Sequence, residues 1–222
     1  MFTGIIEGYG TLKKIEPIGE GKRLAILTDM DLSSTKIGDS IAVNGACLTV
    51  VTLKGTLFEV DMAPETVVRT TFKHLAPGAR LNLERALRLS DRLDGHLVSG
   101  HIDGTGRVLA KTVKSNAVIV TIGIPSTLAG EIIEKGSVAI DGISLTINRC
   151  SDNDFDVSVI PHTAKITTIG IRNVGDEVNI ETDMIGKYVN SFLKRNTTDA
   201  TAGTGSNTGS ISMELLAKKG FL

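Results

Sequence analysis

An internal repeat is the feature that most constrains how this chain folds. Residues 40–50 read SIAVNGACLTV, and residues 137–147, 97 positions later, read SVAIDGISLTI. Each copy is an apolar run, Asn-Gly or Asp-Gly, and a second run with small polar groups. These dipeptides tolerate positive φ angles and predict a tight hairpin turn in each copy. The copies differ where Cys47 corresponds to Ser144, which indicates two similar pockets with slightly different roles.

The repeat extends over most of the chain. Residues 2–10 (FTGIIEGYG) correspond to 98–106 (VSGHIDGTG), and residues 58–66 (FEVDMAPET) correspond to 155–163 (FDVSVIPHT). Each copy closes on Asn-apolar-Glu, at 82–84 and at 179–181. Blocks in one order at a nearly constant offset predict two tandem domains of one fold. We place these domains at residues 1–96 and 97–183.

Short apolar runs alternate with Gly, Asn and Asp through residues 1–180, which is typical of a β-barrel or sandwich. The Gly104-Thr105-Gly106 segment is interpreted as a turn. The expected strands cover residues 24–27, 40–43, 47–53, 57–61, 80–83, 117–122, 138–140, 145–147, 155–160 and 177–180.

A helix is expected at residues 184–195, with Asp183 as its N-cap. Its apolar residues fall at helical spacing and form one stripe. The stripe packs either on its own barrel or against other subunits, and the pattern favours neither. Residues 196–222 begin with a Thr-, Gly- and Ser-rich stretch and are expected to form a flexible tail. The stripe consists of Met184, Ile185, Tyr188, Val189, Phe192 and Leu193.

Composition argues against several classes of protein. The net charge of −1 favours neither nucleic acid nor an anionic membrane, and the absence of Trp argues against base-stacking surfaces. Cys47 and Cys150 are too few and too far apart for a disulfide framework or a zinc pattern. The chain shows no signal-peptide pattern at Met1 and no segment of membrane-spanning length, so we expect a cytoplasmic protein.

Standard catalytic motifs are missing from the sequence. It contains no phosphate-binding loop, no His-x-x-x-His spacing and no Gly-x-Ser-x-Gly elbow. His101 stands where the first copy has Ile5, and an imidazole there can transfer protons near neutral pH. Taken alone, His101 is better explained as a surface or satisfied histidine and Cys47 as core filler. Ser144 and Thr146 alone would be ordinary strand or turn hydroxyls, and Lys135 and Asp183 a surface charge or a cap. Their duplicated context points to a pocket that recurs.

The chain resembles the riboflavin synthase α-chain family. The similarity lies in residues 1–7 (MFTGIIE), 44–49 (NGACLT), 95–102 (GHLVSGHI), 141–146 (DGISLT) and 179–183 (NIETD), and it extends to about residue 195. The resemblance implies an all-β fold of two tandem six-stranded Greek-key β-barrels related by a pseudo-twofold repeat. It also implies a C-terminal α-helix that joins three subunits into a homotrimer.

The resemblance also implies the reaction. Two molecules of 6,7-dimethyl-8-ribityllumazine dismutate into riboflavin and 5-amino-6-(ribitylamino)uracil by transfer of a four-carbon unit, without a metal or an organic cofactor. The C7 methyl of this substrate is acidic, because its anion is delocalised over the ring. The protein must therefore hold two like heterocycles face to face and manage protons. The implied site lies between the N-terminal barrel of one subunit and the C-terminal barrel of a neighbour.

The family's binding residues can be carried over to matching positions. The first barrel's set is Gly4, Ile5, Ile6, Cys47, Leu48, Thr49, Asp61, Met62, Ala63, Pro64, Glu65 and Thr66, with Asp61, Glu65 and the threonines expected on the ribityl hydroxyls. The second barrel's set is Gly100, His101, Ile102, Lys135, Ser144, Leu145, Thr146, Ser158, Val159, Ile160, Pro161, His162 and Thr163.

Six residues are expected to carry the chemistry. His101 and Thr146 assist proton removal from the C7 methyl. Cys47 and Ser144 act near C7, as a nucleophile or by orienting a water. Phe2 shapes the stacking surface, and Asp183 positions catalytic groups.

Two other functions are compatible with such barrels. A non-catalytic lumazine- or flavin-binding antenna protein shares the fold but degrades one of its two pockets. A flavin-dependent reductase barrel would be followed by a nucleotide domain, which this chain lacks. Because both pockets keep their motifs here, the enzyme is favoured.

Overall fold

The computed structural model describes the backbone of residues 1–201 and the side chains of residues 1–193. Residues 202–222, which contain most of the predicted tail, lie outside the described part. The chain divides into a compact unit, Met1–Tyr188, and a second unit that begins at Val189. The first unit contains all the strands described below.

The first six strands close into an antiparallel barrel in the order β1-β2-β5-β4-β3-β6. The non-sequential order makes it a Greek key. Alternate residues point inward, as in β5, where Phe58 and Val60 are fully buried. The strands are β1 (Gly8–Ile18), β2 (Gly21–Thr28), β3 (Ser40–Val43), β4 (Ala46–Lys54), β5 (Leu57–Met62) and β6 (Arg80–Arg85).

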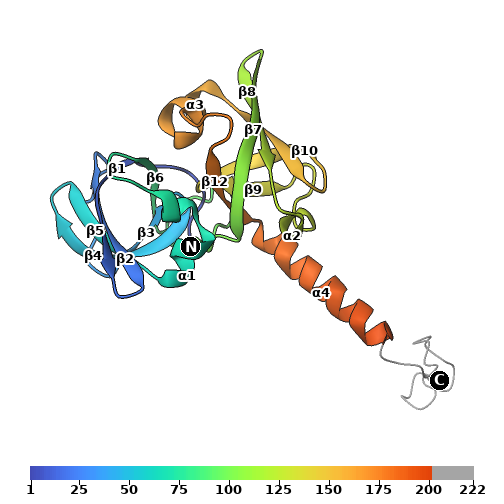
Figure 1. Cartoon of the computed structure of the whole chain (residues 1–222), viewed down its shortest axis with the longest axis horizontal. Helices are drawn as coiled ribbons and strands as arrows, with labels where there is room; N and C mark the ends of the chain where they lie inside the picture. Colours follow the sequence, from blue (N-terminus) through green and yellow to red (C-terminus); the bar gives the residue numbers. More distant parts are fainter. Residues whose placement is uncertain (202–222) are drawn as a thin grey trace. The chain divides into compact units, whose positions relative to one another are not determined.

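The second six strands close into a barrel of the same topology, in the order β10-β11-β8-β7-β12-β9 (Figure 1). Phe155 of β11 is fully buried at the position that corresponds to Phe58. The predicted fold of two six-stranded Greek-key barrels and a C-terminal helix is therefore confirmed. The strands are β7 (Gly104–Lys114), β8 (Ala117–Gly123), β9 (Ser137–Ile140), β10 (Ile143–Cys150), β11 (Asp154–Val159) and β12 (Glu177–Thr182).

Short helices follow the same strand in each barrel. In the first barrel, α1 (Pro64–Arg69) and the 3-10 turn η1 (Thr71–His74) follow β5. In the second, α3 (Pro161–Ile166) and η2 (Thr168–Gly170) follow β11. Both α-helices begin with proline, whose fixed φ suits a first helical turn. The second barrel also has α2 (Ser126–Ala129), between β8 and β9.

The first strand of each barrel was not expected from the sequence. Segment 104–106 opens β7 and does not form the predicted turn. Most residues of β1 and β7 are exposed or half-buried, so the sequence shows no continuous apolar run. Gly10 and Gly106 lie inside these strands. Glycine is needed at both positions, because an added Cβ would lie only 2.6 and 2.7 Å from side-chain carbons of Ile26 and Ile122.

The C-terminal helix, α4 (Met184–Thr201), starts where predicted but extends beyond the expected end at Arg195. Asp183 is its N-cap, since the side-chain Oδ1 accepts a hydrogen bond of 2.9 Å from the backbone N–H of Ile185. Residues 196–201 contain neither glycine nor proline, so the backbone meets no helix breaker before Gly203. The predicted tail therefore begins inside the helix.

The two barrels meet through reciprocal hydrogen bonds of two buried asparagines. Asn82 Nδ2 donates to the carbonyl of Asp141, and Asn179 Nδ2 donates to the carbonyl of Asn44, both at 2.9 Å. Their side-chain oxygens accept from backbone N–H groups of the opposite half, Thr168 and Thr71. Buried amides satisfied in this way fix one arrangement of the halves, because any other leaves polar groups unpaired.

The hairpin turns of the two barrels differ in charge. Asn44 Oδ1 accepts from the backbone N–H of Asn82, and its Nδ2 is buried without a partner among the described residues. At the matching position, Asp141 Oδ1 accepts from the backbone N–H of Asn179, and Oδ2 lies 2.7 Å from Arg172 Nη2. Leu75, which packs against the first core, occupies the position in the first copy that corresponds to Arg172. The first barrel therefore has two uncharged residues, Asn44 and Leu75, at the positions where the second barrel has the Asp141–Arg172 ion pair.

Candidate active site

Cys47 and Ser144 follow the two hairpin turns at equivalent places. Asn44 and Gly45 have φ angles of 43° and 82°, and Asp141 and Gly142 have 45° and 81°. Two consecutive positive φ angles are typical of a type I′ turn, which confirms the turn prediction. Cys47 and Ser144 lie on β4 and β10, and both are half-buried.

The N-terminal segment bridges the two barrels. Glu84 of β6 accepts hydrogen bonds from the backbone N–H and hydroxyl of Thr3 and from the backbone N–H of Gly4, at 2.6–3.0 Å. The carbonyl of Gly4 accepts a bond of 2.8 Å from the backbone N–H of Ser144, in the other barrel. A carboxylate of the first barrel thus holds the segment against the second.

The segment between the barrels repeats this arrangement in reverse. Glu181 of β12 accepts from the backbone N–H and hydroxyl of Ser99 and from the backbone N–H of Gly100. The carbonyl of Gly100 accepts a bond of 2.8 Å from the backbone N–H of Cys47. Each half of the chain therefore supplies a segment that lines the other half's barrel.

This exchange corrects the predicted grouping of the site residues. Gly4, Ile5 and Ile6 were assigned to the first barrel, but Gly4 contacts Ser144 and Ile6 packs against the second core. Gly100, His101 and Ile102 were assigned to the second barrel, but Gly100 contacts Cys47 and Ile102 is part of the first core. We call residues 3–6 and 99–102 the crossing segments, because each packs on the barrel of the other half. A sequence repeat matches equivalent positions but does not show on which barrel such a segment packs.

The remaining predicted binding residues of the first barrel, 48–49 and 61–66, form a largely open surface on β4, β5 and α1, which we call the first face. Thr49 is exposed and pairs with Asp61, while Leu48 and Met62 are buried. Asp61 is already bound by the Arg23 guanidinium at 2.6 and 2.8 Å, and this hydrogen bond lowers the pKa of the carboxyl. Ala63, Pro64 and Glu65 are exposed, Thr66 is half-buried, and Glu65 pairs with Arg69.

The corresponding predicted residues of the second barrel, 144–146 and 158–163, lie on β10, β11 and α3, which we call the second face. Thr146 is exposed, Leu145 is half-buried, and Ser158 Oγ accepts a hydrogen bond from Asn148. Val159 is buried and Ile160 is exposed at the start of α3. Pro161 and His162 are exposed and Thr163 is half-buried, matching their counterparts in α1. Both predicted faces are thus accessible in the single chain.

His96 is a histidine that sequence reasoning did not select. It is 9% exposed, and its Nδ1 lies 2.7 Å from Ser144 Oγ. Its backbone N–H donates to the carbonyl of Thr3, which fixes the ring beside the second barrel. Burial lowers the pKa of His96, and the nearby Asp183 carboxylate opposes that effect. Neither the repeat nor a motif spacing pointed to this residue. The sequence feature that could have indicated it is the Gly95-His96 dipeptide just before residues 99–102.

Phe2 and His101 differ sharply in exposure. Phe2 is fully buried in a small cluster with Ala42, Val98 and Ala139, so its ring supports the Cys47 segment from behind and presents no stacking face to a ligand. That Phe2 shapes the stacking surface stays a prediction, and its buried ring could do so only from behind the Cys47 strand. His101 is exposed, and its backbone N–H is held by Ser99 Oγ at 3.1 Å.

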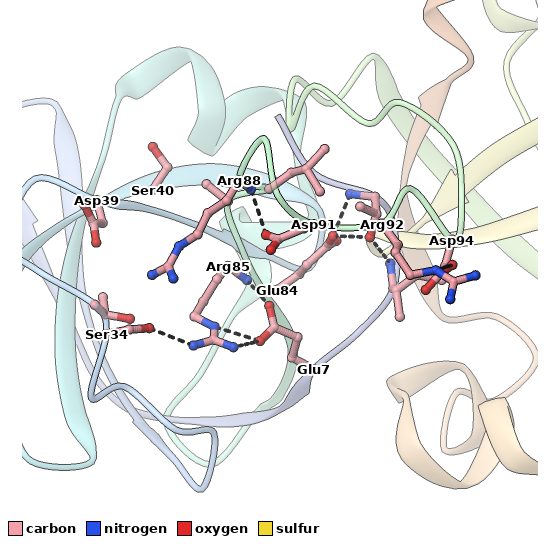
Figure 2. A pocket seen from close by; sticks show the side chains of 15 residues that line it. Glu7, Ser34, Asp39, Ser40, Glu84, Arg85, Arg88, Asp91, Arg92 and Asp94 are labelled. Atoms are coloured by element: carbon pink, nitrogen blue, oxygen red, sulfur yellow. Dashed lines mark hydrogen bonds and ion pairs between the residues drawn. The ribbon is translucent and has the colours of Figure 1, made fainter.

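A cavity of about 480 Å³ lies between the N-terminal segment, β6 and the linker after it, and Ile5 is the predicted binding residue that lines it. Figure 2 shows Arg85 directed at the Glu7 carboxylate and the Ser34 hydroxyl, and these contacts measure 2.6–3.0 Å. The cavity contains neither Cys47 nor Ser144. Its charged groups largely satisfy one another, so it is a weaker candidate than the duplicated faces.

Comparison with known proteins identifies the family. The lumazine binding domain family matches residues 3–86 and 99–183, one match for each barrel. Riboflavin synthase of Bacillus subtilis is 41% identical over 221 residues, covering all of both chains. The chain belongs to the riboflavin synthase family. Two other riboflavin synthases support this assignment. The Photobacterium phosphoreum protein is 40% identical over all of both chains, and the Mycobacterium tuberculosis protein is 42% identical over 87% of this chain and 98% of the relative.

Solved structures link the riboflavin synthase fold to bound ligands. Crystal structures of LumP complexed with 6,7-dimethyl-8-(1'-D-ribityl) lumazine and with riboflavin give TM-scores of 0.73 and 0.75. In each comparison the identity is 30%, and the match covers 82% of this chain and 99% of the other. LumP, which shares this fold, therefore binds a lumazine and riboflavin.

Among residues 1–193, no three His, Cys, Asp or Glu side chains cluster so that they could hold a metal ion. Within the described backbone, every helix is too short or too polar to cross a lipid bilayer.

Lys135 carries backbone strain at the edge of the second face. Its φ angle is +65°, whereas the corresponding residue of the first copy is Gly38, at +96°. A side chain in this region costs about 1 kcal/mol relative to glycine. Strained non-glycine residues concentrate at functional sites, so the predicted binding role of Lys135 is the one that the test below addresses.

Proposed function

We propose that this chain carries out the riboflavin synthase reaction with one lumazine on each kind of barrel face. The substrate reacts with a second copy of itself, and the protein offers two faces built from one repeated motif. The equivalent placement of Cys47 and Ser144 after matching turns is the observation that carries this proposal. Holding two reactants in reactive geometry supplies much of the rate enhancement, since effective molarities reach roughly 10⁵ M or more.

The exchanged segments give the two faces different chemistry. The first face combines Cys47 with the segment that carries His101, and the second combines Ser144 with the segment that carries Ile5. We assign His101 and Thr146 to proton transfer at the C7 methyl, and Cys47 and Ser144 to positions near C7. Because His101 and Thr146 belong to different faces, the two serve one pair of substrates when a first barrel faces a second barrel.

A direct assay tests this function. Purified protein is mixed with 6,7-dimethyl-8-ribityllumazine, and products are separated by chromatography. We expect one riboflavin and one 5-amino-6-(ribitylamino)uracil for every two lumazines consumed. An antenna protein would bind the lumazine and return it unchanged, and that result would refute the proposal.

We further propose that the faces meet between subunits of a cytoplasmic homotrimer. Support comes from α4, where Ile185 and Tyr188 are 63% and 65% exposed and continue into a stripe with Val189 and Phe192. An apolar stripe of this kind on a helix is normally buried against a partner.

Replacing Tyr188 with glutamate tests the trimer, because a charge in an apolar helix interface is costly to bury. We expect light scattering to give the mass of three chains for the parent protein and of one chain for Tyr188→Glu, with at least a tenfold loss of riboflavin formation. Asn190→Asp, which adds a negative charge to α4 at a position outside the stripe, is the control. A variant that is monomeric and fully active would contradict the shared site.

Replacing Lys135 with glycine should separate stability from activity. We expect the free energy of unfolding to rise by about 0.5–1 kcal/mol as the positive φ angle is relieved. Riboflavin formation should fall at least tenfold, because the substitution removes an exposed ammonium group that we propose contacts the substrate. Ser115→Gly, at a φ of +55° in an exposed hairpin turn, is the matched control and should keep full activity. Urea denaturation and steady-state kinetics provide the two measurements.

A further inference from the structure

The hydrogen bond between His96 and Ser144 has no equivalent at Cys47. Ser144 Oγ lies 2.7 Å from His96 Nδ1. Within residues 1–193, no side chain makes a hydrogen bond to the Cys47 thiol, which is free and half-buried. The two matching positions therefore differ in their partner as well as in their chemical group.

The backbone around His96 is held by the N-terminal segment, and the ring lies against Ser144 of the second barrel. The His96 backbone N–H bonds to the Thr3 carbonyl, and the neighbouring Val98 pairs with Phe2 in both directions. Gly95 allows the close approach, because a Cβ there would lie 2.0 Å from the Thr3 carbonyl oxygen and 3.1 Å from Ser144 Cβ. Residues 95–98 (GHLV) thus hold the His96 imidazole against Ser144, and the backbone hydrogen bonds restrict its movement.

The other ring nitrogen, Nε2, is buried without a hydrogen-bond partner among the described residues. We assign the proton of the neutral ring to Nε2, which leaves the Nδ1 lone pair to accept the Ser144 hydroxyl proton. The charged group near the ring is Asp183, at the start of α4, while β10 contributes Ser144 and the N-terminal segment contributes Thr3. A neutral imidazole beside a hydroxyl, with a carboxylate near enough to favour its charged form, is arranged as a general base.

We propose that His96 takes the proton of Ser144 during attack on C7 of the lumazine bound at the second barrel. This inference rests on the function proposed above. An oxygen, either Ser144 Oγ or a water that Oγ orients, bonds to C7, and the displaced π-electron pair moves onto the conjugated ring. The O–H proton passes to Nδ1. When the C7–O bond later breaks, its electron pair returns to oxygen and the proton leaves Nδ1.

This assignment makes the two barrels chemically unequal. The lumazine at the second barrel is the one activated at C7 by addition. The lumazine at the first barrel meets an unassisted thiol and the exposed His101. His96 acts through Ser144 or the oriented water, so it is a positioning and proton-holding residue rather than a direct contact of the substrate.

His96→Asn is the decisive variant, because the asparagine amide reaches the Nδ1 position and keeps a hydrogen bond to Ser144 but cannot take a proton. We expect kcat to fall about 100-fold. The lumazine dissociation constant, measured by equilibrium dialysis, should change less than about threefold because the second face keeps its shape. An unchanged kcat, or a loss seen only in binding, would overturn the proposal.

Two further backgrounds distinguish a base from a structural contact. In Ser144→Ala, adding His96→Asn should lower kcat less than twofold, because the group served by His96 is already gone. In Ser144→Cys, which copies the first barrel, a thiol of pKa about 8.5 needs less help from a base, so the cost of His96→Asn should shrink to roughly tenfold or less. Equal costs in all three backgrounds would indicate a structural role and refute the assignment.

The controls keep the outcomes separable. If the parent protein forms no riboflavin, the proposed function itself fails, and the histidine variants are not needed to decide that. If His96→Asn does not fold, as judged by circular dichroism, His96→Gln keeps most of the ring volume without its basicity and takes its place. Full activity of a folded His96→Gln would contradict the proposal.

Discussion

We expect Arg172→Leu to lower the free energy of unfolding by about 3–5 kcal/mol, because it leaves a buried carboxylate without its cation. The Asp141 side chain is 1% exposed and that of Arg172 is 23% exposed, with two contacts of 2.7 and 3.1 Å between them. The carboxylate keeps the Asn179 backbone N–H and the Thr168 hydroxyl as partners, but two neutral donors do not compensate a buried charge. Urea denaturation followed by circular dichroism measures the effect.

The first barrel supplies the matched control for this prediction. Asp141→Asn combined with Arg172→Leu copies the Asn44 and Leu75 pair that occupies the same place 97 residues earlier. We expect the double variant to lie within about 1 kcal/mol of the parent, since replacing both members of a buried ion pair is often nearly neutral. A double variant as unstable as Arg172→Leu would show that the ion pair does not explain the loss.

The loss caused by Arg172→Leu should also depend on pH. Burial raises the pKa of Asp141, and Arg172 opposes this, so removing the arginine raises the folded-state pKa further. A carboxyl whose pKa is higher folded than unfolded is tolerated below its unfolded value and becomes destabilising as pH rises through the folded value. The deficit of Arg172→Leu should therefore be small near pH 4 and largest at neutral pH and above. A deficit independent of pH would argue against an unpaired charge as its cause.

The fold could be predicted from the sequence because each local rule agreed with the repeat. The Asn44-Gly45 and Asp141-Gly142 turns are hairpin signals whose φ angles the structure bears out. Most of the short apolar runs became strands in the predicted places. The strands β1 and β7 were missed because they carry few inward-facing apolar residues, and their glycines are needed for close packing inside the barrel rather than for turns.

The site was harder to predict, since it depends on contacts across the repeat. The motifs named residues that the structure places beside one another, such as Gly4 with Ser144, but assigned them to the wrong barrel. Nothing in a linear repeat indicates that two glutamates hold crossing segments against the opposite barrel. His96 escaped notice for a related reason: its partner Ser144 is 48 residues away and belongs to no common pattern.

Those crossing segments explain why we expect Gly100→Ala to reduce riboflavin formation by about 100-fold, the cost of misplacing catalytic groups by roughly an ångström. Gly100 has a φ angle of +85°, and a Cβ there would lie 2.5 Å from Cys47 Cβ and 2.9 Å from the buried ring of Phe2. Neither neighbour can yield easily, so the segment must move away from β4. That movement stretches the bond between the Gly100 carbonyl and the Cys47 N–H and carries His101 off the first face.

Gly175→Ala separates this displacement from backbone strain alone. Gly175 has a φ angle of +97°, but a Cβ there would meet nothing within 4 Å. Both substitutions should cost about 1 kcal/mol of stability from the positive φ angle, whereas only Gly100→Ala should lose catalysis. Steady-state kinetics with lumazine and urea denaturation of both variants provide the comparison. If Gly175→Ala lost as much activity as Gly100→Ala, general destabilisation would explain the effect and the crossing segment would have no special role. If Gly100→Ala remained fully active, His101 would not need its place beside Cys47.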